Sequence, residues 1–164
     1  MIKECTKCPL YSNMPFGPCI SNHNGDIYCI FHSISDDSKI SDEIVTGFEK
    51  QILRKLVPEE RWYLSSLVRC HSDSPIKTKI LKTCSEWIPI EIGSNKPNKV
   101  ITFGLIPFRA FNQNKQSFTQ AIFKTHYSSI IGEFLCVPTL HDLGRSAKGL
   151  IKAQKIVGEY IGIH

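Results

Sequence analysis

The chain has 164 residues, of which 41% are hydrophobic and 21% charged, the balance of an ordinary globular protein of one-domain length. Its apolar runs are too short to span a membrane, and its first residues lack the hydrophobic region of a signal peptide. We therefore expect a single domain over residues 1–164, a cytoplasmic location and no membrane partner, a setting in which the seven cysteines favour metal ligation over disulfides.

Positive charge is concentrated in the second half of the chain. The net charge is +5, and residues 83–164 hold nine Lys and Arg against five Asp and Glu, whereas residues 1–82 hold eleven against ten. A basic half suits a polyanionic partner. A solvated, lysine-rich surface that maintains solubility explains the same bias, so charge alone leaves both interpretations open.

The chain begins with a predicted loop and a predicted buried strand. Residues 9–25 are crowded with Pro, Gly, Asn and Ser, which indicates a long loop. Residues 27–31 form a continuous apolar run, typical of a central parallel strand buried on both faces. His32 follows, and we place it in the loop after this strand. Its unperturbed pKa makes it a candidate base near neutral pH, with a polar surface residue as the alternative.

The middle of the chain alternates helix and strand patterns. Residues 42–56 carry apolar side chains near helical spacing, and Pro58 ends the pattern. Residues 62–68 are rich in aromatic and apolar side chains, which predicts a short buried strand beside the first strand. A helix is predicted over residues 77–92, and it carries Cys84.

The last third of the chain continues this alternation. We predict a third strand at residues 99–103, from which Gly104 permits a tight turn into a helix beginning near residues 107–111. A fourth strand is predicted at residues 134–137, followed by a final helix at residues 150–161.

This pattern predicts a three-layer α/β/α domain with a central four-stranded, mostly parallel sheet. Ligands of such sheets bind beyond the carboxyl ends of the strands. The loops that contain His32, Cys70, Gly104 and His141 are expected to leave those ends, so they can share one rim.

Four cysteines have a spacing that suits a metal centre. Cys5 and Cys8 form a C-x-x-C pair whose short loop can present two sulfurs to one metal centre. Cys70 follows the predicted second strand and Cys84 lies fourteen positions further on, so both thiols can converge on one point. Structural zinc sites usually use two compact ligand pairs, whereas iron–sulfur clusters accept scattered cysteines. Spacing thus favours a cluster, with zinc and unrelated or redox-active thiols as alternatives.

Several motifs carry a resemblance to a known family. They are CxxCPL at residues 5–10, a strand that ends in V-R-C before Pro75, and the further Cys84. Residues 97–104 and 137–141 are similar to two more family motifs, P-K-V-I-v-x-L-G and v-x-P-T-x-H-P-S. Together these motifs resemble the family-4 uracil-DNA glycosylases, over almost the whole chain.

The resemblance implies a uracil-DNA glycosylase-like fold, a cofactor and a partner. Members of the family hold a 4Fe–4S cluster near the N-terminal loop, and the matching ligands here are Cys5, Cys8, Cys70 and Cys84. DNA is the implied partner, since these enzymes pull a nucleotide from the base stack and hold it in a pocket. His141 matches the histidine of the second motif and, with His32, is a candidate catalytic residue.

Three positions depart from the family pattern. His32 replaces the acidic turn at the end of the first strand, and Ile44 replaces the aromatic residue that stacks on the flipped base. Ser66 stands where the family has the asparagine that reads the uracil edge, and a hydroxyl cannot make the paired contact of an amide. We therefore keep Ser66 as a candidate DNA contact but expect uracil excision to be weak or absent.

The segment at residues 141–148 is the expected DNA contact. In the family the loop after the histidine enters the minor groove, and here Leu143 is an apolar side chain that can separate stacked bases. Arg145 and Lys148 lie at the start of the final helix, where their side chains and the backbone amides can meet phosphates. Alternatively, both cations are simply solvated and Leu143 packs inward.

The sequence thus predicts a DNA-binding iron–sulfur protein of this superfamily with lost or altered glycosylase chemistry. It would act in DNA replication, repair or another DNA transaction, with other replication or repair proteins as candidate partners. One alternative is an active glycosylase that excises uracil or another base, which leaves open whether the chain is an enzyme. The other is a protein-interaction module with a structural cluster.

Overall fold

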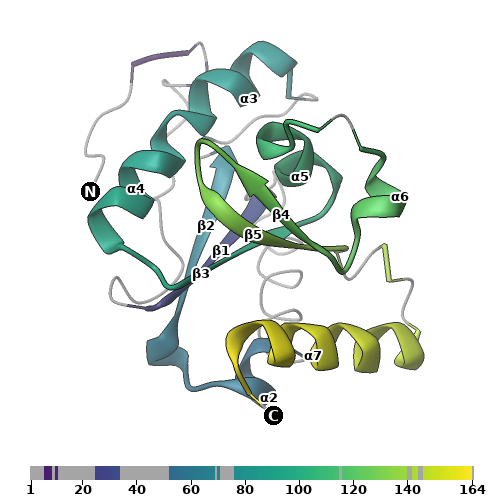
Figure 1. Ribbon diagram of the computed structural model, residues 1–164. Coiled ribbons are helices and arrows are strands. Elements are labelled where there is room, and N and C mark those ends of the chain that lie inside the picture. Colours follow the sequence, from purple (N-terminus) through teal and green to yellow (C-terminus); the bar gives the residue numbers. More distant parts are fainter. Residues whose placement is uncertain are drawn as a thin grey trace.

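The computed structural model describes residues 6–8, 10, 25–33, 52–68, 70, 76–114, 116–139, 142–143 and 146–163, with positions 32, 33 and 59 described by their backbone (Figure 1). In chain order the elements are β1 (Ile27–Ser33), α2 (Arg54–Leu56), the 3-10 helix η3 (Glu59–Arg61), β2 (Trp62–Val68), α3 (Thr78–Ser85), α4 (Trp87–Asn95), β3 (Lys99–Phe103), α5 (Leu105–Phe111), α6 (Phe118–Ala121), β4 (Thr125–Ser128), β5 (Gly132–Val137) and α7 (Ala147–Ile161).

The described strands form one sheet in the order β2-β1-β3-β5-β4. The first four of these strands are parallel, and β4 pairs antiparallel with β5. β1 lies in the interior, where Ile27 is paired with Trp62 on one side and with Lys99 on the other. The predictions of a mostly parallel sheet, and of the second strand lying beside the first, are confirmed.

The predicted number of strands was wrong, because the described residues already form a sheet of five strands rather than four. The additional strand is β4, a four-residue edge strand that joins β5 through a tight turn ending at Gly132, whose φ is 76°. In β4 only Ser128 is buried, while Thr125 and Tyr127 are exposed. An edge strand buries little surface, so its sequence does not need the continuous apolar run that indicated the other strands.

Residues of the parallel strands alternate between two hydrophobic clusters, one on each face of the sheet. Tyr28 and Ile30 face the cluster that contains Ile88 of α4 and Phe108 of α5. Because successive side chains of a strand point to opposite faces, Cys29 and its neighbours face the other cluster. Figure 1 shows α3, α4, α5 and α6 on one side of the sheet and α7 on the other. The sheet is therefore a middle layer between two helical layers, as predicted.

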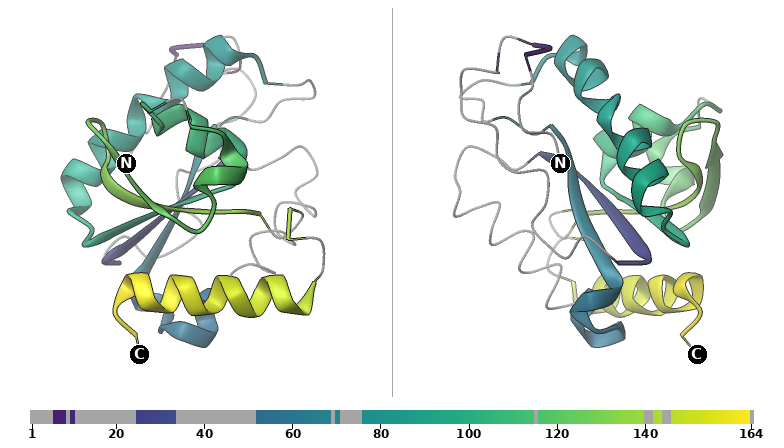
Figure 2. Two further views of the ribbon diagram at one scale, coloured as in Figure 1. Left: turned by 45° about the vertical axis from the view of Figure 1, so that its right-hand side comes forward. Right: turned by 90° about the vertical axis from the view of Figure 1, so that its left-hand side faces the viewer.

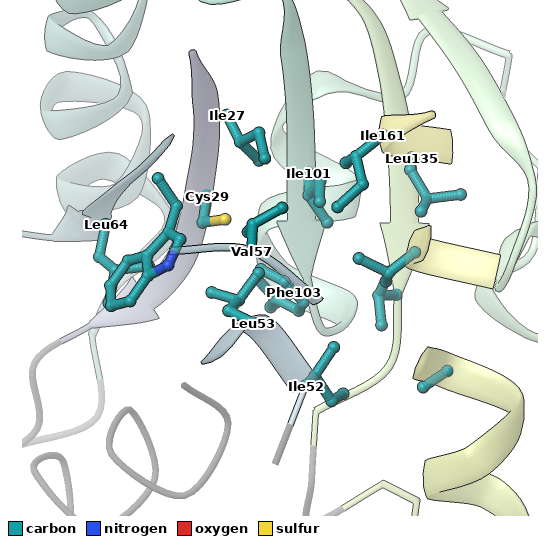
Figure 3. Packing of buried hydrophobic residues seen from close by; sticks show 14 of the residues in the cluster. Ile27, Cys29, Ile52, Leu53, Val57, Leu64, Ile101, Phe103, Leu135 and Ile161 are labelled. Carbon is teal, nitrogen blue, oxygen red and sulfur yellow. The ribbon is translucent and has the colours of Figure 1, made fainter. Parts of the chain in front are cut away.

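The cluster on the α7 side joins segments from the whole length of the chain. In Figure 3, side chains of β1, β3 and β5 meet those of the segment before β2 and of α7. The labelled residues are Ile27, Cys29, Ile52, Leu53, Val57, Leu64, Ile101, Phe103, Leu135 and Ile161. Near the carboxyl ends of β1 and β3 the rings of Phe31 and Phe103 stack with their centroids 4.7 Å apart. This core fixes α7 against the sheet.

Three predicted helices have different bounds in the structure. The helix predicted to begin near residues 107–111 is α5, which begins at Leu105. The helix predicted at residues 77–92 is divided at Glu86 into α3 and α4. Pro89 explains the division, because it has no N–H to donate to the carbonyl of Ser85, four residues earlier. The final helix begins three residues earlier than predicted, at Ala147, where the Ser146 hydroxyl accepts a hydrogen bond from Gly149 N as an N-cap. Of the helix predicted at residues 42–56, residues 42–51 lie outside the described part.

Close backbone packing and an ion pair hold the start of β1 against the start of β2. Arg61 donates to both carboxylate oxygens of Asp26, from Nε at 3.1 Å and from Nη2 at 2.8 Å. The Arg61 hydrogen bond holds the pKa of Asp26 below its usual value. A Cβ atom at Gly25 would lie 2.6 Å from the carbonyl carbon of Trp62, so the backbone before β1 and the start of β2 approach closely here.

We predict that Gly25→Ala destabilises the protein by about 1–3 kcal/mol, because its methyl group would meet backbone atoms that cannot move aside. The matched control is Gly93→Ala in α4, where a Cβ has no atom within 4 Å. That change should instead stabilise the helix by about 0.5–1 kcal/mol. Urea unfolding of both variants measures the difference, and equal midpoints for Gly25→Ala and the wild type would contradict the close approach.

Candidate functional site

The carboxyl ends of β3 and β5 meet at Gly104, which follows β3 directly. Its N–H donates to the carbonyl of Val137 at 2.8 Å. Its φ of 89° and ψ of 175° belong to a region that glycine adopts readily. A Cβ at this position would lie 2.7 Å from Cγ2 of Thr139. The turn after β3 therefore packs directly against the loop after β5, so two of the four loops predicted to share one rim lie side by side.

The loop after β5 is held by reciprocal hydrogen bonds between Thr139 and Asp142. The Asp142 carboxylate accepts from Thr139 N at 3.0 Å and from Thr139 Oγ1 at 2.7 Å. In return, Asp142 N donates to Thr139 Oγ1 at 3.1 Å, and Leu143 N donates to the Thr139 carbonyl at 2.9 Å. Sequence reasoning assigned no role to Asp142. Its spacing of three residues from Thr139 was the available signal, since short polar side chains often close such turns.

Two residues of the predicted DNA contact are described, and they differ in exposure. Leu143 is half-buried, packs against the cluster on the α7 side, and has its Cδ2 atom 3.4 Å from a Cβ built at Gly149. Lys148 is exposed in the first turn of α7. His141 and Arg145 lie outside the described residues, so the structure brings Leu143 and Lys148 to the same end of α7 without placing the other two.

The predicted base-contacting residue Ser66 lies inside the sheet. It is 2% exposed, and its hydroxyl donates to the carbonyl of Val68 at 2.8 Å. To contact a DNA base, this hydroxyl would have to give up its hydrogen bond to Val68.

His32 belongs to β1, so its predicted position in a loop after the first strand was wrong. The strand continues to Ser33, which is paired with Val68 of β2.

Ser65 takes part in a polar cluster on the opposite face of β2, which the sequence did not indicate. The carboxylate of Glu91 on α4 accepts hydrogen bonds from Ser65 Oγ at 3.0 Å and from the Tyr28 hydroxyl. The ring of Tyr28 stacks on that of Tyr63 with centroids 4.9 Å apart. This cluster fixes α4 on the sheet. Strand alternation was the available signal, because it sends Ser65 and Ser66 to opposite faces.

The N-terminal segment that carries Cys8 lies against the junction of α3 and α4. Both views of Figure 2 place residues 6–8 beside α3. The Lys7 ammonium is 3.0 Å from the Glu86 carboxylate and 4.6 Å from the centre of the Trp87 ring. Cys8 is 9% exposed, although Lys7 beside it is exposed. These contacts bring the predicted ligand Cys8 to the helix that carries the predicted ligand Cys84.

The other predicted ligands are buried, or lie outside the described part of the chain. Cys70 is 4% exposed and follows β2, and Cys84 is 3% exposed on α3, which packs against β2. Within the described residues, no three His, Cys, Asp or Glu side chains are grouped so that they could hold a metal ion. Cys8, Cys70 and Cys84 are all described, and the structure does not bring these three together as such a group. Cys5 lies outside the described residues, so the four-ligand set remains a prediction.

Two further cysteines belong to the hydrophobic core of the sheet. Cys29 in β1 and Cys136 in β5 are fully buried. Burial raises the pKa of Cys136 to about 12 and also raises the pKa of Cys29. Metal ligation requires the thiolate, which this apolar environment disfavours. The structure thus gives these two cysteines a packing role.

Comparison with known proteins assigns no family to this chain. A scan against models of protein families finds no match, and neither does a search of curated proteins. The resemblance to family-4 uracil-DNA glycosylases therefore rests on the motifs in the sequence. Among the described helices, none is long and apolar enough to cross a membrane.

We predict that Gly104→Ala destabilises the protein by about 2–4 kcal/mol, through an unfavourable φ and a clash with Cγ2 of Thr139. Thr139→Ser removes that methyl group and keeps the hydroxyl that bonds to Asp142. The double variant should therefore recover about 1 kcal/mol relative to the sum of the single changes, in a double-mutant cycle measured by urea unfolding. Strict additivity would show that the two loops do not touch in solution.

Proposed function

We propose that this chain is a DNA-binding iron–sulfur protein of the uracil-DNA glycosylase type, with lost or altered base-excision chemistry. The observation that carries the proposal is the docking of the Cys8 segment on the helical junction beside Cys84. Lys7 makes that contact with both Glu86 and Trp87, which ties the C-x-x-C motif to a part of the chain far away in sequence.

The chemistry of the donor set supports a metal centre. Cys8, Cys70 and Cys84 come from three segments that are distant in sequence, and all three are buried. Thiolate sulfurs suit both iron–sulfur clusters and zinc. The scattered ligands and the family-like motif favour the cluster, which Cys5, Cys8, Cys70 and Cys84 would bind. Zinc is the alternative that the experiment below distinguishes.

The proposed cluster has a structural role. Ligands at the N-terminus, after β2 and within α3 would close long loops, which lowers the entropy of the unfolded chain. The surface contacts of Lys7 alone are weak, because an exposed ion pair is screened by water and salt. A metal centre would supply the stronger link that holds the N-terminal segment in place.

We predict that protein purified without oxygen is brown and contains iron and sulfide. Cys84→Ser should lose most of the iron and melt at a lower temperature, because a cluster ligand is removed. Cys29→Ala is the matched control, since Cys29 lies in the core of the sheet, and it should keep its iron. Metal analysis, visible absorption and thermal melting measure these outcomes. Stoichiometric zinc without iron would contradict the cluster.

The proposed DNA partner is supported by the rim and by the distribution of charge. Parallel sheets bind ligands beyond the carboxyl ends of their strands, where Gly104 contacts Thr139. The same edge leads through Leu143 into α7, whose first turn exposes Lys148. The altered chemistry is supported by His32, Ile44 and Ser66, which replace the acid, the aromatic residue and the asparagine of the family.

We predict that Arg145→Glu with Lys148→Glu weakens DNA binding across all sequences, because phosphate contacts carry affinity without reading bases. The dependence of log K on log salt should become shallower by roughly one to two units, about one for each phosphate that the variant no longer binds. Lys79→Glu with Lys82→Glu on the exposed surface of α3 makes the same change in charge and should bind like the wild type. Binding is measured by fluorescence anisotropy of a labelled duplex.

Other outcomes would favour the alternative functions. If a folded Arg145 and Lys148 variant kept both its affinity and its salt dependence, the contact at residues 141–148 would be wrong. Robust release of uracil from a single strand, abolished by His141→Ala, would support the active glycosylase. If the wild-type protein did not bind DNA at low salt, the protein-interaction module would replace the present proposal.

A further inference from the structure

The outer face of α7 carries a row of lysines. Ala153, Val157 and Ile161 are buried against the sheet, which fixes the rotation of the helix. The charged side chains on the opposite, exposed face are Lys148, Lys152, Lys155 and Glu159. The lysines are separated by four and then three residues, so they follow one line along the helix surface. This face therefore has three positive charges and one negative charge.

One lysine of this row, Lys152, also contacts the segment that precedes β4. The Lys152 ammonium lies 4.9 Å from the centre of the Phe123 ring. Phe123 is fixed in place, because its N–H donates to the carbonyl of Cys136 at 2.7 Å and its side chain packs against the core. We call the three lysines at positions 148, 152 and 155 the α7 basic face.

Acidic groups lie toward the carboxyl end of the helix. Glu159 is 3.8 Å from Lys155 in an exposed pair, which is weak because solvent screens it. Burial, with a smaller contribution from Glu133, raises the pKa of Tyr160 to about 12. The lysines of α7 itself thus lie in the first part of the helix, and Lys99 of β3 adds a positive charge near the carboxyl end, where its ammonium is 4.5 Å from the centre of the Tyr160 ring.

We propose that the α7 basic face binds the phosphate backbone of DNA, so that the contact extends beyond Lys148 along the whole first half of the helix. This inference rests on the proposed function. The lysine row is about 10 Å long at a rise of about 1.5 Å per residue. Each strand of a duplex presents one charge per roughly 3.4 Å of its axis, so a row of that length spans about three phosphates of one strand. The complementary charge favours a polyanion over an apolar or basic partner.

The ring of Phe123 restricts the position of the Lys152 ammonium. A lysine over an aromatic face is attracted by the ring, and it keeps N–H donors for a phosphate on its other side. Lys152 should therefore lose less side-chain conformational entropy on binding than a lysine without such a contact. Phosphate contacts of this kind position a protein on DNA without reading its sequence.

The test compares two variants with the same loss of charge on opposite faces of the sheet. Lys152→Gln with Lys155→Gln removes the middle of the α7 basic face and keeps Lys148. The control, Lys79→Gln with Lys82→Gln, changes the exposed surface of α3. Both variants and the wild type are titrated with a labelled duplex of about 20 base pairs between roughly 50 and 200 mM salt, and their melting temperatures confirm folding.

We expect the α7 variant to lose about tenfold or more in affinity at about 0.1 M salt, with a salt slope shallower by roughly 1.8, because each duplex phosphate contact contributes about 0.9. The α3 control should match the wild type. If the wild type binds DNA and the α7 variant binds equally well, the α7 contact is wrong while the proposed function stands. If the α3 variant alone loses affinity, the contact lies on the other face and the inference is also wrong.

Failure of the proposed function has a different signature. Absence of wild-type binding to the duplex at about 50 mM salt would overturn both the DNA partner and the α7 contact. A second probe, vesicles that contain phosphatidylserine, tests the other common anionic surface. Vesicle binding that depends on Lys152 and Lys155, with DNA binding unaffected by their replacement, would assign the basic face to a membrane surface and overturn the inference.

Discussion

The structure depends on the burial of β1 between two strands and between two helical layers. Ile27 and Tyr28 pair with β2 on one side and with β3 on the other, while successive side chains enter opposite hydrophobic clusters. A strand in this position satisfies its backbone hydrogen bonds through both neighbours and removes both of its faces from water. The parallel arrangement then directs the carboxyl ends of β1, β2, β3 and β5 to one edge of the sheet.

That edge determines where a ligand can approach. Gly104, directly after β3, packs closely against Thr139 in the loop after β5, and Asp142 closes that loop through its hydrogen bonds with Thr139. The same loop leads into α7, so a DNA contact at residues 141–148 and the lysine row on α7 would form one continuous interface. Ser66 and Val68 lie within the sheet, where the Ser66 hydroxyl donates to the carbonyl of Val68.

The cysteines separate into two groups with different surroundings. Cys29 and Cys136 lie in apolar layers of the sheet, where burial raises the thiol pKa and opposes ligation. Cys8, Cys70 and Cys84 lie at the ends of segments or on a helix surface that packs against β2. The three described members of the proposed ligand set thus lie outside the five strands of the sheet, and among the described residues they do not form a group that could hold a metal ion.

The sequence by itself determined the elements whose signals are local. The bounds of the strands at Trp62–Val68 and Lys99–Phe103 agree with the predictions, because strands buried on both faces are rich in apolar side chains. The tertiary structure decided what depends on distant residues. β4 is a strand because β5 pairs with it, Lys7 finds its partners at Glu86 and Trp87, and Lys152 lies over Phe123. Such contacts leave no periodic pattern in the sequence, since each forms only when the folded sheet brings two remote segments together.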